Sequence, residues 1–483
     1  MSSLTKTRTA DSTAKPAING TAADIELQSG SASPVTGHAE ELRRDFSVWS
    51  LGALLVFSPK TYDLTTTLGQ YHWVASLAPS HTRLVASWFT GWINIGGQIV
   101  LTASAAFAAG LQFQALIVLN DASETYVPQR WQGMLFYWLI IVYSTIVNIF
   151  GVRVLPHTNT ISGIVHVVGF VATVIVLGVM GVGQQGGHTA EYVFKQFENS
   201  SGWENDGVSW LVGMLSAVYP FLGYDAAAHL AEELPNPSRS VPLAMIGSIV
   251  VNGLMGLIYC IVMLFALGDL TSLLSSPTGF PFMQLFQNVT GNRAGATILS
   301  LFISLIAVAA NAAGTTSTSR TAWAFARDRA VPFSSYFAHV DERWEVPVRM
   351  VVCTSVLQAL LGFIYLGNTT AFNAILSMAI LGMYASYILP IAYMLAYGRR
   401  PDSPIRAPGP FSLGAWGPWV NAAAVAWLAV AMVFSTFPSV QPVTPQNMNY
   451  ASVVLGGWVA FGVVYYVGFA RRWYEGPVVE VFG

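Results

Sequence analysis

The stretch from Ser216 to Met245, "SAVYPFLGYDAAAHLAEELPNPSRSVPLAM", places residues that could do chemistry inside a long apolar segment. Pro220 and Gly223 should interrupt a helix, because proline removes a backbone hydrogen bond and glycine is a poor helix former. Within a membrane, such an interruption survives only where it faces protein or a water-filled cavity. The backbone groups that it frees could bind a small solute or an ion. The alternative is an ordinary proline kink.

Two titratable side chains follow this interruption. Asp225 comes two residues after Gly223, and His229 lies four residues further on, on the same helical face. A carboxylate in a membrane needs a partner, so Asp225 could contact a cationic group, stabilise the unwound segment or cap the second half-helix. A His–Asp pair could carry a proton, although a hydrogen-bonded core histidine is the commoner case. Glu232 and Glu233 come next and are expected to pair with loop arginines.

Other polar residues interrupt the apolar segments. Asn311 and Thr315, four residues apart, could line a cavity, while close helix packing explains the small residues around them equally well. The stretch "GWINIGGQ", residues 91–98, has the same two explanations. His166 is the one titratable group between residues 160 and 181, and it could take part in ion coupling. No nucleophile–base pair, phosphate-binding glycine loop or metal-ligand cluster is visible, so we expect no enzyme activity, no metal and no cofactor.

Composition indicates what holds these residues in place. The chain has 483 residues, of which 53% are hydrophobic and 10% charged, against about 25% charged in soluble domains. The apolar excess must therefore face lipid. A net charge of −2 does not indicate a nucleic-acid partner. Residues 1–45 are polar and poor in core-forming side chains, so we expect a disordered tail.

A helix needs about 20 residues to cross a bilayer. We expect residues 46–470 to form one transmembrane domain, followed by a short cytoplasmic tail at 471–483. A stub from Phe46 to Ser58 is too short to cross. Ten other runs are long enough: Leu84–Leu119, Trp131–Phe150, Thr160–Gly181, Gly207–Leu230, Val241–Leu267, Ala294–Phe325, Val348–Leu366, Phe372–Tyr397, Gly417–Phe437 and Ala451–Ala470.

Most of the arginines between these runs fall in alternate loops, which predicts that those loops are cytoplasmic. Two glycosylation candidates, Asn199 and Asn288, fall on the opposite side. The basic N-terminal tail should also be cytoplasmic. Only about forty residues separate Arg44 from Arg83, too few for two crossings and a turn. The sequence therefore predicts either that a segment is missing here or that the stub does not cross.

Four stretches carry a resemblance to a known family. Residues 221–245 resemble the sixth-helix signature of the amino acid–polyamine–organocation superfamily, and "AFARDRAVPFSSYFAHV", residues 324–340, is similar to its loop after the eighth helix. "GQYHWVASLAP", residues 69–79, resembles the loop after the second helix, and "FSVWSL", residues 46–51, the start of the first. The nearest branch in these motifs is the fungal amino acid/choline/GABA permeases.

The resemblance implies an all-α polytopic membrane protein with a LeuT-like fold: two inverted five-helix repeats, plus two C-terminal helices. The first repeat would be incomplete, because roughly fifty residues of the first two helices have no counterpart. It also implies plasma-membrane symport of amino acids, GABA, choline or polyamines, usually with H+, by alternating access. Substrate would contact the backbone at Phe221, Leu222, Gly223, Tyr224 and Asp225. A non-transporting sensor on the same fold, or a non-functional truncated permease, is the alternative.

Overall fold

The structure, a computed structural model, describes residues 69–477 except residues 124, 152–154, 185–186, 198, 200, 232–236, 401–411 and 446. Several predictions fall outside this range and are not addressed by it: the N-terminal tail, the stub at Phe46–Ser58, the pair Glu232 and Glu233, and the end of the C-terminal tail from residue 478.

The described residues fold almost entirely into helices, and ten helical segments among them are long and apolar enough to cross a membrane. Each one matches a run predicted from the sequence to within a few residues, so the prediction of ten spans is confirmed. They are α3 (Arg83–Asn120), α4 (Arg130–Phe150), α5 (Leu155–Val176) with the π-helical η2 (Leu177–Gln184), a broken span made of α7 (Asp206–Gly213), α8 (Leu215–Val218), η3 (Tyr219–Phe221) and α9 (Ala226–His229), then α10 (Pro237–Phe265), α13 (Arg293–Arg327), α15 (Val348–Gly367), α16 (Thr369–Ala396), α17 (Gly417–Phe434), and α18 (Ala451–Tyr465) with η6 (Tyr466–Ala470) and α19 (Arg471–Trp473).

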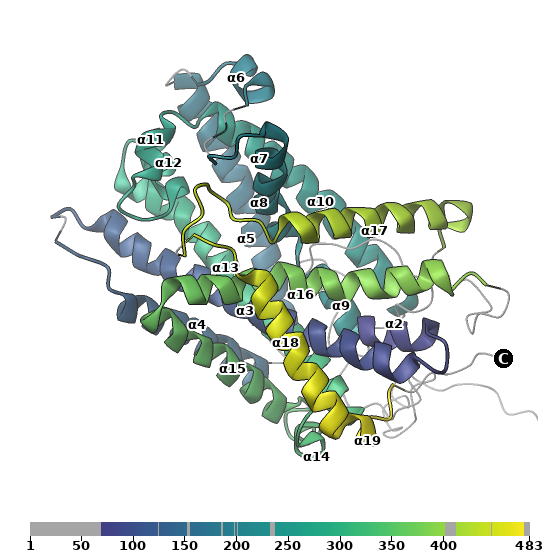
Figure 1. Ribbon diagram of the computed structural model, residues 1–483. Coiled ribbons are helices and arrows are strands. Elements are labelled where there is room, and N and C mark those ends of the chain that lie inside the picture. The colour runs from purple at the N-terminus through teal and green to yellow at the C-terminus, as the bar shows by residue number, and fades with distance from the viewer. Residues whose placement is uncertain are drawn as a thin grey trace, which may run out of the picture.

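Five shorter helices accompany these spans: α2 (Gln70–Leu77), α6 (Ala190–Lys195), α11 (Leu270–Leu274), α12 (Pro281–Thr290) and α14 (Ser334–Phe337). Figure 1 shows α6, α11 and α12 at one end of the molecule, and α14 and α19 at the opposite end. The expectation that residues 69–79 form a loop is wrong, because residues 70–77 of this stretch form the helix α2, in which all eight residues are buried. It packs against α3 and α16, and this tertiary burial of its aromatic side chains stabilises a helix that would be too short to form alone.

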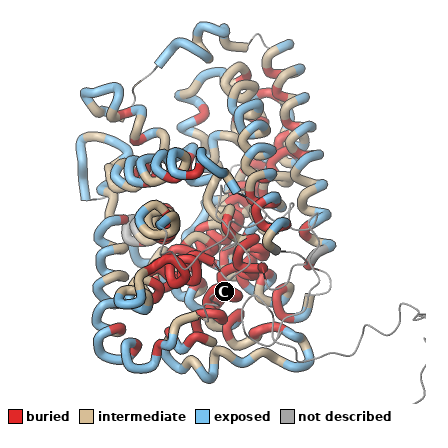
Figure 2. Tube along the Cα trace, turned by 90° about the vertical axis from the view of Figure 1, so that its right-hand side faces the viewer, coloured by how far each residue is buried: buried red, intermediate tan, exposed pale blue. Residues whose placement is uncertain are grey.

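The long helix α3 lies at the centre and packs against α13, α16, α4 and α2. Its contact with α16 is made backbone to backbone. A Cβ atom on Gly97 would lie 2.9 Å from the backbone nitrogen of Met383, and one on Gly382 would lie 2.9 Å from the Gly97 Cα atom. Glycine is therefore required on both helices for this close approach. Figure 2 shows the buried residues gathered toward the interior of the molecule.

The outer faces of the peripheral helices are exposed (Figure 2), and many of the exposed side chains there are large and apolar. Examples are Ile164 on α5, Leu254 on α10 and Val464 on α18, which are 60%, 57% and 69% exposed. Soluble proteins rarely expose apolar side chains over such a large contiguous area. These faces therefore belong in the hydrocarbon core of a bilayer.

The connection between α3 and α4 is folded around one carboxylate. Asp121 accepts hydrogen bonds from the Ser123 hydroxyl at 2.7 Å and from the backbone nitrogens of Ser123 and Tyr126 at 3.1 and 2.6 Å. The Ser123 hydroxyl bond, together with the backbone bonds, stabilises the charged form and lowers the pKa of Asp121 to about 2. The turn is thus held by an ionised group throughout the neutral pH range.

Near the end of the described residues, a short segment, Tyr474–Gly476, lies against two helix ends. The Tyr474 hydroxyl is 2.8 Å from that of Ser87, near the start of α3. Glu475 forms an ion pair of 2.7 Å with Arg329, just past the end of α13. Tyr474 is buried whereas the ion pair is exposed, so the tyrosine contributes more to the attachment than the charges do.

Candidate functional site beside a broken span

The span from Asp206 to His229 is interrupted where the sequence predicted. After α8, the residues of η3 form a single 3-10 turn with Pro220 in its second position, and Leu222 is extended. Gly223 then adopts φ +88°, a conformation that side chains with a Cβ atom rarely tolerate. Helical structure resumes at Ala226, the start of α9. Proline and glycine together therefore replace the middle of a membrane helix with irregular backbone.

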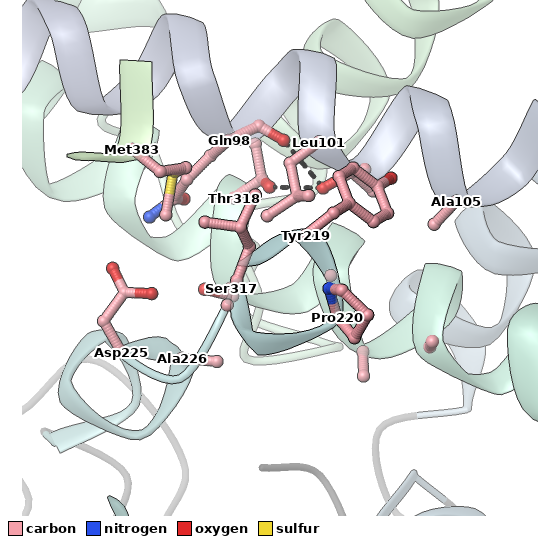
Figure 3. A pocket seen from close by; sticks show the side chains of 16 residues that line it. Gln98, Leu101, Ala105, Tyr219, Pro220, Asp225, Ala226, Ser317, Thr318 and Met383 are labelled. Carbon is pink, nitrogen blue, oxygen red and sulfur yellow. Dashed lines mark hydrogen bonds between the residues drawn. The ribbon is translucent and has the colours of Figure 1, made fainter. Parts of the chain in front are cut away.

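A cavity of about 280 Å³ lies beside this break. Four elements form its wall: α3, the unwound segment, α13 and α16. Small residues on α13, such as Gly314, leave room for it, and Ser317 and Thr318 supply hydroxyl groups. Figure 3 shows Asp225 and Ala226 toward one end of the cavity and Ala105 toward the other. The volume is close to the lower end of the range for small-molecule sites, so the cavity fits a compact solute.

Asp225 is the acidic residue of this wall, and its carboxylate is fully hydrogen bonded. Tyr387 on α16 donates its hydroxyl to Oδ1 at 2.8 Å. Gln70 on α2 donates its amide to Oδ2 at 2.5 Å, and Nε2 of His229 lies 2.8 Å from the same oxygen. Asp225 precedes α9, yet its side chain makes no capping hydrogen bond. Of the roles considered from the sequence, the capping role is therefore wrong, and the bonds join the unwound segment to two other helices.

A second set of amides surrounds these partners. Asn94 on α3 donates to the side-chain oxygen of Gln70 at 2.7 Å and to Ser386 on α16 at 3.2 Å. The amide nitrogen of Gln98, also on α3, lies 2.7 Å from Nε2 of His229. Every member of this network is less than one-tenth exposed. The network thus fixes α2, α3, α9 and α16 relative to one another around a single carboxylate.

The structure brings part of the predicted substrate segment to the cavity. Leu222, Gly223 and Asp225 lie in its wall. The ring of Tyr224 packs against that of Tyr387 with centroids 4.4 Å apart, and Phe221 completes the 3-10 turn. Geometry alone does not test contact with substrate, so that role stays a prediction for all five residues of the segment.

The other predicted coupling and cavity residues occupy different positions. His229 bonds with Asp225, as described above. Asn311 donates to the backbone oxygen of Thr102 at 2.8 Å, and Thr315 donates to that of Asn311 at 2.9 Å. Both are fully buried and neither is among the residues that line the cavity. His166 lies half-buried on α5, outside both the cavity wall and the hydrogen-bond network. Their roles in coupling stay predictions.

The two glycosylation candidates also differ in accessibility. Asn288 is an exposed residue of α12. The amide nitrogen of Asn199 already donates to the backbone oxygen of Trp203 at 2.7 Å and to Asp206 at 3.0 Å. Modification of Asn199 would require these bonds to break.

Sequence reasoning missed five members of the network: Gln70, Asn94, Gln98, Ser386 and Tyr387. Gln70 and Gln98 each lay in a stretch that had been singled out, but for family resemblance or for packing. A glutamine in an otherwise apolar helix could have been noted as a group that needs a buried partner. Nothing in the sequence around Tyr387 distinguishes it from the other aromatic residues of its helix.

Comparison with known proteins identifies the family. A family model described as amino acid permease matches residues 47–460. This chain belongs to the amino acid permease family. The permease is 35% identical to an uncharacterised amino-acid permease of Schizosaccharomyces pombe over 86% of its own length and 76% of the relative's. It is 30% identical to the choline transporter of Saccharomyces cerevisiae over 82% and 69%, and to amino-acid permease BAT1 of Arabidopsis thaliana over 86% and 81%.

A solved structure shows the same fold. The permease superposes on the crystal structure of MhsT in complex with L-phenylalanine with a TM-score of 0.53 and 14% sequence identity, over 81% of its own chain and 92% of the other. The permease is therefore a multi-pass integral membrane protein with a LeuT-like fold, as the sequence predicted. It is a transporter by family and not an enzyme.

Proposed function

We propose that this permease is a secondary active transporter that imports amino acids or related small amino compounds by alternating access, driven by protons. The observation that carries the proposal is the cavity beside the broken span, with the buried Asp225–His229 pair next to it. Irregular backbone and a buried titratable pair at one place in a membrane protein indicate a solute and ion pathway. The family and the names of the relatives support the same substrate class.

The proton would be held by the Asp225–His229 pair. Their 2.8 Å contact joins a carboxylate oxygen to a ring nitrogen, an arrangement that needs one proton between the two atoms. Both side chains are almost completely buried, so a change in their net charge is costly unless a compensating charge arrives. A change of access, which admits water to the pair, would reduce that cost.

We further propose that the permease resides in the plasma membrane. We also propose a cytoplasmic N-terminus, which the distribution of arginines supports. The exposed position of Asn288 fits glycosylation on the opposite side. The short interval between Arg44 and Arg83 still predicts either that a segment of roughly fifty residues is missing between them or that the stub does not cross. Without that segment the substrate cradle would lack its contribution from the first helix.

Uptake by purified permease in proteoliposomes tests the proposal. The probes are radiolabelled GABA, L-phenylalanine, spermidine and choline, each with and without an inward proton gradient. We expect saturable uptake of at least one probe, stimulated by the gradient and abolished in Asp225→Asn. Asp121→Asn, a change outside the site, is the control and should transport normally. Binding of a probe without flux would favour the sensor. The absence of both binding and flux for all four probes would overturn the proposal.

A further inference from the structure

Two neighbouring residues at the start of α2 have partners in different parts of the molecule. Gln70 donates its amide to Oδ2 of Asp225 at 2.5 Å and accepts from Asn94 at 2.7 Å. The backbone oxygen of Tyr71, the next residue, accepts from the Ser87 hydroxyl at 2.9 Å. The first turn of α2 therefore connects the buried carboxylate of the site with the start of α3.

The hydroxyl of Ser87 carries one proton, and this proton sets the direction of the bonds around it. Because Ser87 donates to the backbone oxygen of Tyr71, its oxygen can only accept from other groups. The Tyr474 hydroxyl, 2.8 Å away, is then the donor. The result is a chain of two hydrogen bonds that runs from Tyr474 through Ser87 to Tyr71. These three residues are 5%, 0% and 2% exposed, so water cannot readily replace a lost member.

The first turn of α2 depends on such tertiary bonds for its position. Its N-cap residue, Gly69, makes no side-chain capping hydrogen bond, so the first N–H groups of the helix are not fixed by a cap. Further along, Trp73 and Leu77 belong to an apolar cluster with α10 and the second half of the broken span. Apolar packing is non-directional. The bonds at Tyr71 therefore decide where the first turn lies, and with it the side chain of Gln70.

The Tyr474–Gly476 segment fits closely against its neighbours. The Tyr474 ring lies beside that of Phe325 with centroids 6.0 Å apart, and Phe325 makes an edge contact with Tyr71 at 5.3 Å. Gly476 has φ +77°, and a Cβ atom there would lie 2.8 Å from the Leu84 side chain. Glycine is therefore needed for the segment to lie against α3. A larger residue at this position would displace the segment without removing any hydrogen-bonding side chain.

We infer that Tyr474 is a positioning residue for the site: it fixes the first turn of α2 and so holds Gln70 on the Asp225 carboxylate. When the Tyr474–Gly476 segment is displaced, Ser87 loses its donor and the first turn of α2 is held less firmly. Because Asp225 lies in the wall of the cavity, the affinity for the transported solute falls. The end of the chain thus acts on the site through α2. The inference rests on the proposed function and adds a distant residue to its site.

Uptake kinetics and hydrogen exchange together test the inference. Tyr474→Phe removes the first donor of the chain, and Gly476→Ala displaces the segment through its backbone. Glu475→Gln, which breaks only the exposed ion pair with Arg329, is the matched control. The probes are GABA, L-phenylalanine, spermidine and choline in proteoliposomes. Since one buried hydrogen bond limits the effect to about tenfold, we expect KM to rise about threefold in the first two variants, with the maximal rate and the control nearly unchanged.

A double variant separates positioning from a general loss of stability. Gln70→Met keeps the length of the side chain but cannot donate to Asp225, so it should itself raise KM. If Tyr474 acts through Gln70, Tyr474→Phe should have no further effect on KM in the Gln70→Met background. If the two residues act independently, the two effects on KM should multiply, and that result would overturn the inference.

Hydrogen exchange, measured by mass spectrometry, needs no substrate. Exchange of residues 70–77 should be faster in Tyr474→Phe and Gly476→Ala than in the wild type and in Glu475→Gln. Unchanged exchange in the first two variants would overturn the inference, while the proposed function would stand on its own test. If the wild type transports none of the four probes, the proposed function fails, and faster exchange confined to these two variants would still support the placement of α2 by Tyr474.

Discussion

Replacing Asp225 with asparagine tests the network most directly, because it removes the charge while keeping the shape. Three hydrogen bonds converge on the carboxylate, from Gln70, His229 and Tyr387. Asparagine keeps one oxygen, which can still accept from Tyr387. Its new NH₂ group would face the amide donor of Gln70, so the bonds to Gln70 and His229 are lost in their present form.

The size of the effect follows from burial. Asp225 is 2% exposed, so water cannot replace the lost partners. Breaking a buried ionic interaction by removing one partner costs about 3–5 kcal/mol. Tyr387→Phe removes a single hydrogen bond to a charged group and should cost less, about 1.5–3 kcal/mol. The order of destabilisation should therefore be Asp225→Asn first and Tyr387→Phe second.

Denaturant unfolding of the purified permease in detergent, followed by tryptophan fluorescence, gives both free energies. Asp121→Asn should be destabilised less than either variant at neutral pH, since Asp121 is on the surface and water can replace its lost partners. The free energy of unfolding of Asp225→Asn could instead lie within about 1 kcal/mol of the wild-type value, which is the range of an exposed ion pair. That result would show that the carboxylate does not hold the four helices together. The structural reasoning would then be wrong whatever the transport assay showed.

Four further predictions follow from particular features. Gly223→Val forces a β-branched residue into a positive φ, at about 1–3 kcal/mol, and should strongly reduce uptake; normal uptake kinetics would contradict an unwound segment. Gly97→Val would place carbon atoms against the backbone of α16, so the yield of monodisperse protein in size-exclusion chromatography should fall, and an unchanged yield would refute that contact. The pKa of Asp121 is lowered to about 2, so its stabilisation is present above its ordinary pKa of 3.8 and is lost as pH falls toward 2; Asp121→Asn should weaken the pH dependence of unfolding in that window and leave it unchanged at pH 7. The native transcript between the codons for Phe46 and Gln98 should be about 150 nucleotides longer than the present sequence requires, and a product of the present length would mean that the shortening is real.

The spans were predictable because lipid imposes a simple rule on the backbone. Each crossing must satisfy its own hydrogen bonds over about 20 residues, and the apolar runs record that requirement directly. The break at residues 219–225 was equally visible, since Pro220 and Gly223 cannot continue a helix without loss. In both cases the residue types along a single segment were sufficient to predict its structure.

The partners of Asp225 were not predictable in the same way. Tyr387 lies 162 residues further along the chain, and only the packing of α16 against the unwound segment brings it close. Gln70 reaches the carboxylate because α2 is buried against α3 and α16, although eight residues without an apolar stripe gave no sign of a buried helix. Contacts that depend on how several helices pack together cannot be predicted from the residue spacing within one of those helices.

The short segment Tyr474–Gly476 has a practical consequence for handling the protein. It ties the start of α3 and the end of α13 together through Ser87 and Arg329. A purification tag or fluorescent fusion that replaced residues 474–476 would release both helix ends, whereas one joined after residue 477 would leave these bonds in place. Movements that part these two ends would either break the Tyr474 contact or carry the segment along.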